Sequence, residues 1–423
     1  RGVRKLPPGG VVRIGPGGEP AERRWFDMLA LARGTAPAAL APAEAAEAVD
    51  AELERSVRRQ LVADVPVGAF LSGGVDSASV TAAMARAAPG AAHAFTIGFD
   101  DPRYDESGDA AALARALGIR HTVLRATVAE AAALVPDLPA VYDEPFADAS
   151  QLPTLLLCRL ARGHVTVALS GDGGDELFGG YRRHLFAARH WPRLRAVPPP
   201  LRRGLAALLG AVPERAWDAA LGALPGTPRR PGETLRKLAA VLGARDLDEV
   251  YARLTTTDGA VSARPDAPGE PLRRFRALDA AGYLHDDVLT KVDRASMSVA
   301  LEVRVPMLSP PLLRLAFSLP SGLLVRGDGG KAVLRDALAR HLPRPLFERE
   351  KTGFAVPVAD WLRGRLRGWA EAMLGGRALG RSGFVDRRRT ERLWRAHLAG
   401  RDAAPTLWPV LMLAAWLEAR EAR

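Results

Sequence analysis

A short loop in the first third of the chain combines hydroxyl, glycine and carboxylate groups at a spacing suited to binding an anion. Residues 72–77 read Ser-Gly-Gly-Val-Asp-Ser and follow the apolar run Val65–Leu71. Two adjacent glycines let the backbone approach an anion without a Cβ in the way, and the helix expected to follow offers free N–H groups. Asp76 would repel phosphate, so its presence predicts a Mg²⁺ between the two. A glycine turn that only joins a core strand to a helix is the alternative.

A second glycine-rich stretch carries further carboxylates. Residues 168–181 read Ala-Leu-Ser-Gly-Asp-Gly-Gly-Asp-Glu-Leu-Phe-Gly-Gly-Tyr and follow another apolar run, Val165–Ser170. So many glycines favour a tight loop that presents side chains to a ligand. Asp76 and Asp175 would together give Mg²⁺ two carboxylates, with phosphate oxygens and water completing its shell. A solvated acidic turn is the alternative.

Strand-like and helix-like segments alternate around these loops. The expected strands are Val65–Leu71, His93–Phe99, His121–Arg125 and Val165–Ser170, and the expected helices are Pro42–Ala63, Ala78–Ala88, Ser107–Leu117 and Ala149–Arg162. The alternation predicts an α/β fold with a doubly wound parallel sheet. Ligands of such sheets bind beyond the carboxyl ends of the strands, where both glycine-rich loops begin.

The remainder of the chain gives the expected domain organisation. Residues 1–42 are rich in Gly, Pro and Ala and are interpreted as an interdomain linker, and the chain begins with Arg rather than Met. Residues 43–423 are expected to form one domain, with an α/β core at about 43–190 and a mainly helical part at about 191–423. The strand pattern ends near residue 185.

Composition excludes several classes of protein. No apolar run approaches the ~20 residues that span a bilayer, and the N-terminus lacks the apolar region of a signal peptide. The only cysteine, Cys158, lies in an apolar stretch, which excludes a disulfide framework and a cysteine metal site. The formal net charge is +11, but the arginines are spread along helical segments without an aromatic-rich basic patch, so no nucleic-acid partner is expected. A cytoplasmic protein without membrane contacts follows.

Lysine is scarce in this chain, which contains only Lys5, Lys237, Lys291, Lys331 and Lys351. Arginine cannot replace the compact, mobile charge of lysine. A lysine inside a motif-like stretch therefore deserves separate consideration, and Lys291 and Lys351 are in such stretches.

Taken together, the motifs resemble those of one family. The loops at 71–77 and 169–181 are similar to the synthetase domain of glutamine-hydrolysing asparagine synthetases, which belong to the N-type ATP pyrophosphatases. The same family is matched by Asp143-Glu-Pro-Phe-Ala-Asp, Lys291-Val-Asp-Arg-Ala-Ser-Met, Leu301-Glu-Val-Arg-Val-Pro-Met-Leu and Glu350-Lys-Thr-Gly-Phe. The resemblance extends from about residue 1 to 400, because Lys5-Leu-Pro-Pro-Gly is similar to the family's interdomain junction.

The resemblance implies an adenine nucleotide alpha hydrolase-like fold and an ATP- and Mg²⁺-dependent ligase. ATP would adenylate the side-chain carboxylate of aspartate and release pyrophosphate, and ammonia would then displace AMP to give asparagine. Full-length members obtain ammonia from an upstream glutaminase domain with an N-terminal catalytic Cys. No such domain is present in this sequence, so a glutaminase domain or subunit is an expected partner, together with the small-molecule substrates and a homodimer.

The same resemblance assigns residues to roles. ATP contacts are expected at Leu71, Ser72, Gly73, Gly74, Asp76, Ser77, Ile97, Ser170 and Gly171. Asp76 and Asp175 would hold the metal, while Asp172 would lie beside the acyl-adenylate, where several members have Glu. Lys351 matches the family's loop lysine, which neutralises phosphate charge.

Contacts with the substrate are assigned to Asp143, Glu144 and Lys291, with structural ion pairing as the alternative. Two other functions remain open. The first is the same adenylation and amide-forming chemistry on another carboxylate, in a related amidotransferase or cyclase. The second is a non-catalytic nucleotide-binding scaffold.

Overall fold

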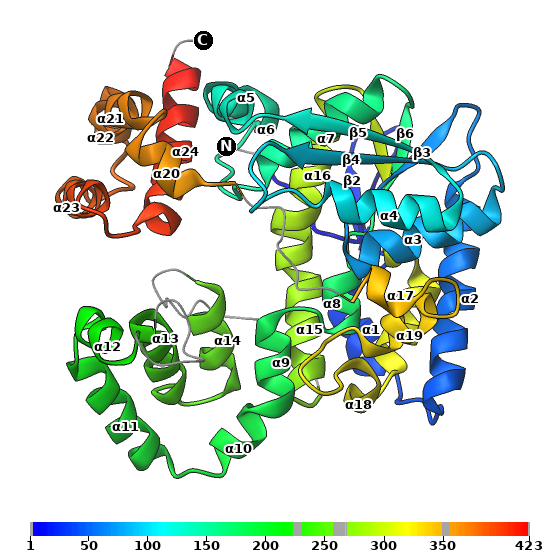
Figure 1. Cartoon of the computed structure of the whole chain (residues 1–423), viewed down its shortest axis with the longest axis horizontal. Helices are drawn as coiled ribbons and strands as arrows, with labels where there is room; N and C mark the ends of the chain where they lie inside the picture. Colours follow the sequence, from blue (N-terminus) through cyan, green and yellow to red (C-terminus); the bar gives the residue numbers. More distant parts are fainter. Residues whose placement is uncertain (1–2, 223–230, 257–266, 268, 349–355, 422–423) are drawn as a thin grey trace.

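The computed structural model describes residues 3–222, 231–256, 267, 269–348 and 356–421. Its centre is a parallel five-stranded sheet with the order β5-β4-β3-β6-β7 (Figure 1). The strands are β3 (Val67–Phe70), β4 (His93–Phe99), β5 (Arg120–Ala126), β6 (Val167–Leu169) and β7 (Glu302–Arg304). The chain runs from β3 through β4 to β5 at one edge, and then returns to place β6 on the other side of β3. This is the doubly wound α/β fold that the sequence predicts.

Both faces of the sheet are buried, each under its own hydrophobic core. Successive residues of a strand point to opposite faces and so contribute to different cores. On β4, Ala94 packs into one hydrophobic core, and Phe95 and Ile97 pack into the other. The first core includes α2 (Pro42–Gln60), α3 (Val75–Ala87), α4 (Ser107–Leu117), α17 (Pro310–Ser318) and α19 (Ala332–Leu338), and the second includes α7 (Gln151–Arg162), α16 (Thr290–Met297), α20 (Val358–Arg363) and α24 (Ala404–Glu421). Burial on two faces explains why the strands read as continuous apolar runs.

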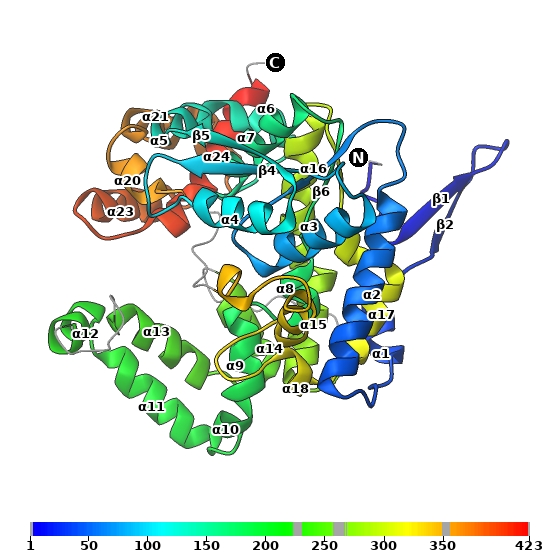
Figure 2. The same cartoon turned by 45° about the vertical axis from the view of Figure 1, so that its right-hand side comes forward.

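Most of the remaining helices form two groups (Figures 1 and 2). One lies below the sheet in Figure 1 and contains α8 (Gly174–Phe178), α9 (Arg182–Arg189), α10 (Trp191–Arg195), α11 (Pro199–Ala211), α12 (Glu214–Leu221), α13 (Pro231–Leu242), α14 (Leu247–Thr255), α15 (Pro271–Ala281) and α18 (Ser321–Leu324). The other contains α21 (Arg367–Gly375), α22 (Arg377–Ser382) and α23 (Arg387–Leu398), and it packs through α24 beside α5 (Val128–Ala133) and α6 (Leu138–Tyr142). Short turns of 3₁₀-helix lie at Val135–Asp137, Pro306–Leu308 and Arg344–Leu346.

The region expected to be a linker contains regular structure. Strand β1 (Gly10–Ile14) pairs antiparallel with β2 (Pro20–Arg24), and this hairpin projects from the body of the protein (Figure 2). Helix α1 (Met28–Gly34) follows and packs against α15 and α17. The predicted domain boundaries at residues 42 and 190 stay predictions.

Strand β7 corrects the expectation that strands end near residue 185. Its three residues pair parallel with β6 and extend the sheet at one edge. A strand of this length is too short to produce a recognisable alternation. Within the described ranges, no helix is both long enough and apolar enough to cross a membrane.

Candidate functional site

The two glycine-rich loops meet at the carboxyl ends of β3 and β6, which are neighbours in the sheet. The winding of the chain changes direction between these strands, and ligands of doubly wound sheets bind at such a switch point. A Cβ on Gly171 would come within 2.6 Å of the Ser77 backbone nitrogen. Only glycine permits this approach, so the second loop packs directly on the start of α3.

The first loop is organised by its own hydroxyl groups. Ser77 Oγ accepts a hydrogen bond from the Ser72 N–H at 3.0 Å and lies 2.9 Å from Ser72 Oγ. The Thr96 hydroxyl of β4 donates to the Leu71 carbonyl at 2.6 Å and fixes the start of the loop. Helix α3 begins after Gly74 without a side-chain cap. The loop therefore presents hydroxyls and the positive end of a helix to the same space.

The glycines of the second loop bring two carboxylates together. Gly173 and Gly179 have φ values of 89° and 76°, in the left-handed region that favours glycine, and they flank the short helix α8. A Cβ on Gly174 would overlap the Asp76 carboxylate. The start of α8, which carries Asp175, is thus packed against the start of α3, which carries Asp76.

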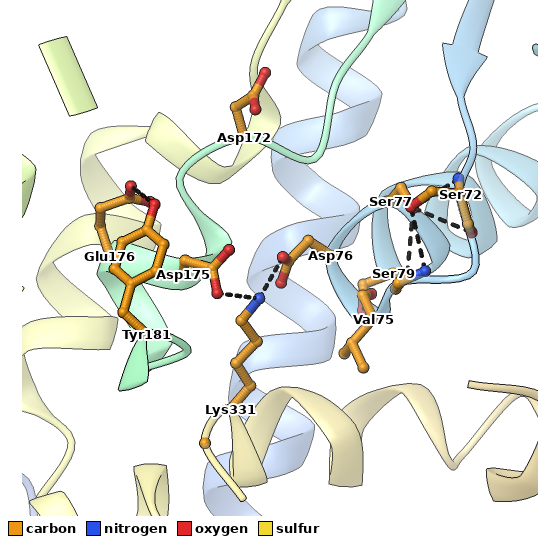
Figure 3. A network of polar contacts seen from close by, with 12 residues as sticks. Ser72, Val75, Asp76, Ser77, Ser79, Asp172, Asp175, Glu176, Tyr181 and Lys331 are labelled. Carbon is orange, nitrogen blue, oxygen red and sulfur yellow. Dashed lines mark hydrogen bonds and ion pairs between the residues drawn. The ribbon is translucent and has the colours of Figure 1, made fainter. Parts of the chain in front are cut away.

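A buried lysine lies between these two carboxylates (Figure 3). Lys331 Nζ is 2.6 Å from Asp175 Oδ1 and also donates a hydrogen bond to Asp76 Oδ2. The Lys331 backbone is left-handed, with φ of 58°, and its N–H donates to the Phe178 carbonyl at 3.0 Å. Burial favours the neutral amine, but Asp76 and Asp175 outweigh it and raise the pKa of Lys331. The group is therefore a charged ammonium at neutral pH.

A second lysine, which is largely but not fully buried, lies on α16. Lys291 Nζ donates to Asp148 Oδ2 at 2.7 Å and to Ser150 Oγ at 2.8 Å. Burial disfavours both charges, but their attraction outweighs it, so the pKa of Lys291 is raised and the pKa of Asp148 is lowered. Burial and the nearby Asp148 raise the pKa of Asp287 to about 6. Asp287 belongs to a π-helical segment, Leu284–Leu289, a type of turn that often marks functional sites.

Two carboxyl groups of the second loop are shifted toward their neutral forms. Burial raises the pKa of Asp172, although the Ser170 hydroxyl opposes this by donating to Asp172 Oδ2 at 2.6 Å. Burial also raises the pKa of Glu176 to about 8, and the Tyr181 hydroxyl donates to Glu176 Oε1 at 2.5 Å. Glu176 is therefore mainly protonated at neutral pH.

The charged side chains described above, except Asp287, line a cavity of about 650 Å³, a size typical of small-molecule sites. No group of three or more His, Cys, Asp or Glu side chains within the described ranges is arranged to hold a metal by itself. The Lys331 ammonium nevertheless shows that Asp76 and Asp175 converge on a point that accommodates a cation. The residues therefore fit a Mg²⁺ that phosphate oxygens would share, not a metal site made by protein ligands alone.

Most residues predicted from the sequence lie in the wall of this cavity. The wall includes Leu71, Ser72, Gly73, Gly74, Asp76, Ser77, Ser170, Gly171, Asp172, Asp175 and Lys291. Ile97 is buried in the second hydrophobic core and is not part of the wall, so its expected nucleotide contact stays a prediction. Lys351 lies outside the described residues.

The two acidic residues expected to contact substrate do not reach the cavity wall. The Asp143 side chain is 73% exposed, and its backbone carbonyl accepts a hydrogen bond from Trp416 Nε1 at 2.6 Å. Glu144 pairs with the exposed Lys5 at 2.6 Å. The segment that follows them reaches the cavity through Asp148 instead.

Lys331 and Asp148 are cavity residues that sequence reasoning missed. For Lys331 a signal exists, because lysine is rare in this chain and Lys331 follows the glycine pair Gly329-Gly330. Asp148 ends the stretch Asp143-Glu-Pro-Phe-Ala-Asp, but nothing in its own position marks it before the fold brings it to Lys291.

Comparison with known proteins identifies the family. The family model described as asparagine synthase matches residues 48–418, which contain the whole cavity wall. The chain belongs to the asparagine synthase family. A putative glutamine-hydrolysing asparagine synthetase of Mycobacterium tuberculosis is 36% identical over 379 residues, which cover 87% of this chain and 57% of that protein. The chain thus spans little more than half the length of such members of the family.

Three other proteins are similar to this chain at lower sequence identity. Glutamine-hydrolysing asparagine synthetase 1 of Bacillus subtilis is 26% identical over 98% of this chain and 65% of its own length. A Penicillium rubens protein named amidase chyE is 24% identical over 91% of this chain and 63% of its own length. A solved NH3-dependent NAD synthetase from Campylobacter jejuni matches 48% of this chain and 97% of its own length at 15% identity, with a TM-score of 0.24 that is too low to support an inference.

Proposed function

We propose that this chain uses ATP to adenylate the side-chain carboxylate of aspartate, releases pyrophosphate, and transfers ammonia to form asparagine and AMP. The observation that carries the proposal is the cavity in which an anion-binding loop, two converging carboxylates and two buried lysines meet. The family match over residues 48–418 supports the same class of reaction.

The first loop binds the phosphates of ATP. The hydroxyls of Ser72 and Ser77 and the start of α3 provide hydrogen-bond donors, and the positive end of the helix favours an anion. Pyrophosphate leaves from this loop, while the backbone of Ser170 and Gly171 on the other side of the switch point contacts the AMP part.

Asp76 and Asp175 are the residues that would hold Mg²⁺. When bound, this ion neutralises phosphate charge and so favours the attack of a carboxylate on phosphorus. Lys331 lies within reach of the same carboxylates and supplies a positive charge on the pyrophosphate side. Lys351 has the corresponding role in our interpretation of the sequence, because a positioned cation stabilises charge that develops on a leaving group.

The second lysine cluster recognises the amino-acid substrate. Lys291 attracts a carboxylate, and Asp148 attracts an ammonium group, so the pair has charges suited to both ends of an amino acid. Asp172 takes up the proton that the attacking ammonia must lose when the new C–N bond forms and the bond to AMP breaks. Its raised pKa suits this role, because a base works best when its pKa approaches the working pH.

The proposed source of ammonia rests on the resemblance to the asparagine synthetases, and the proposed cellular location of the enzyme rests on its composition. Ammonia comes from glutamine through a glutaminase domain or subunit upstream of this chain, and the enzyme works in the cytoplasm. The chain itself contributes the ligase site, with ATP, aspartate and ammonia as its substrates.

A carboxylate other than aspartate is the second candidate substrate. The observation that favours it is the exclusion of Asp143 and Glu144 from the cavity wall, because this removes two contacts expected for aspartate. The amidase chyE similarity adds a relative whose name does not refer to asparagine. The ATP-binding residues serve both candidates equally.

A pyrophosphate-release assay with ATP, Mg²⁺ and ammonium tests the proposal, with aspartate compared against a panel of other carboxylates. Asparagine synthesis is supported if pyrophosphate release depends on aspartate and disappears in Asp76→Asn. Release should persist in Asp137→Asn, a control at an exposed position. Release with another carboxylate but not with aspartate supports the second candidate. No release with any carboxylate from a folded protein overturns both.

A further inference from the structure

Lys331 is fixed in place by contacts with two helices, α3 and α8. Its ammonium contacts Asp76 on α3 and Asp175 on α8, and its own N–H is bonded to Phe178 at the end of α8. The side chain is only 8% exposed. A Cβ on Gly180 would overlap both the Asp175 carboxylate and the Lys331 side chain, so glycine is needed beside the pair.

The ammonium occupies the point at which the two carboxylates converge (Figure 3). A divalent cation held by the same oxygens would meet the positive charge of Lys331 at the same point. Two cations cannot share this space, because their repulsion in a buried site is weakly screened. Entry of the metal therefore requires Lys331 to leave at least one of the carboxylates.

We propose that Lys331 is a resident counter-ion that keeps divalent metal out of the Asp76–Asp175 site until nucleotide arrives. This inference rests on the proposed function, because it takes these carboxylates as the metal ligands. Phosphate supplies the negative charge that Lys331 needs once it leaves the carboxylates, so metal and nucleotide enter together. In the protein without nucleotide, the lysine substitutes for the metal and stabilises the two partly buried carboxylates.

Mn²⁺ binding without nucleotide or carboxylate substrate tests this proposal. We expect the wild-type protein to bind Mn²⁺ weakly, and Lys331→Met to bind it at least about tenfold more tightly, because two carboxylates then lack their ammonium. Lys331→Arg keeps the charge and should remain a weak binder. Lys237→Met is the matched control, because Lys237 is exposed on α13. Adding Asp76→Asn to Lys331→Met should abolish the tight binding.

Thermal unfolding gives a second readout. Mn²⁺ should raise the melting temperature of Lys331→Met more than that of the wild type, since binding to the folded state stabilises it. Equal Mn²⁺ affinity in the wild type and Lys331→Met overturns the proposal, as does tight wild-type binding that Asp76→Asn removes. If Lys331→Met does not fold, the Mn²⁺ affinity of Lys331→Gln is compared with that of the wild type instead. In the wild type, Mn²⁺ should bind through Asp76 only when a non-hydrolysable ATP analogue is present.

These outcomes are separate from failure of the proposed reaction. The Mn²⁺ measurements contain no substrate carboxylate, so they do not depend on whether aspartate is adenylated. If pyrophosphate release fails with aspartate while Lys331→Met gains metal affinity, only the assigned substrate is wrong. If release occurs while Mn²⁺ binding is unchanged, the reaction stands and the counter-ion role does not.

Discussion

The two buried lysines of the cavity have different partners. Lys331 lies between Asp76 and Asp175, whereas Lys291 pairs with Asp148 and the Ser150 hydroxyl. Their side chains are 8% and 15% exposed, so both ammonium groups are largely removed from water.

The difference in partners implies a difference in function. Lys331 places a single positive charge between two carboxylates, an arrangement that favours exchange of the ammonium for a more highly charged cation. Lys291, which is hydrogen-bonded to the single carboxylate of Asp148, forms an ion pair that presents both signs of charge to a ligand. One side of the cavity is therefore suited to metal and phosphate, and the other to a zwitterionic substrate.

Removing a carboxylate on the phosphate side should have the largest effect. Asp76→Asn should reduce ATP–pyrophosphate exchange by about 10²–10³-fold, the range seen when a group that stabilises developing charge is removed. Asp137→Asn, at an exposed position, should change exchange less than twofold in the same assay. Nearly normal exchange in Asp76→Asn would remove the metal and phosphate role from this side of the cavity.

Removing the lysine on the substrate side should alter a different kinetic constant. Lys291→Met should raise the KM for the carboxylate substrate by about 10–100-fold, since a charged hydrogen bond contributes about 1.5–3 kcal/mol. The KM for ATP should change much less. Lys237→Met serves as the exposed-lysine control. Equal changes in both KM values would show that the two sides are not functionally distinct.

Glu176 should make stability depend on pH. Its pKa is raised from 4.5 to about 8, so the folded protein binds more protons than the unfolded chain between these values. The stabilisation is present below about pH 4.5 and is lost as pH rises toward 8, with a slope of up to about 1.4 kcal/mol per pH unit. Denaturant unfolding of wild type and Glu176→Gln should show this slope in their difference. A flat difference would place Glu176 in a more polar setting than its burial indicates.

The smallest effect is expected for a single hydroxyl of the phosphate-binding loop. Ser72→Ala should raise the KM for ATP by about 2–10-fold, because a neutral hydrogen bond contributes about 0.5–1.5 kcal/mol. Ser79→Ala is the matched control on α3, because its hydroxyl donates to the Val75 carbonyl at 2.7 Å. A larger change in the control than in Ser72→Ala would contradict phosphate binding by this loop.

Local sequence predicted where the two glycine-rich loops lie, because each loop is contiguous in the chain; the roles of their residues stay predictions. Strand β4 and helix α4 have the predicted bounds, His93–Phe99 and Ser107–Leu117, and Gly118 ends the helix in the left-handed conformation. Both glycine-rich loops lie at strand ends, as expected from the alternating pattern.

The contacts of the two cavity lysines could not be predicted from local sequence, because they join residues that are far apart in the chain. Lys291 meets Asp148, which lies 143 residues away, and Lys331 meets Asp76 across 255 residues. No local pattern encodes such pairs. The expected substrate residues Asp143 and Glu144 are close to Asp148 in sequence but point elsewhere, because Glu144 pairs with Lys5.

Aspartate-dependent exchange of labelled pyrophosphate into ATP, without ammonia, tests the central claim most directly. This exchange reports adenylation alone and requires the phosphate side and the substrate side to act together. We predict exchange that saturates with aspartate and is lost in Asp76→Asn. A folded protein that binds ATP but shows no exchange with aspartate would contradict the account.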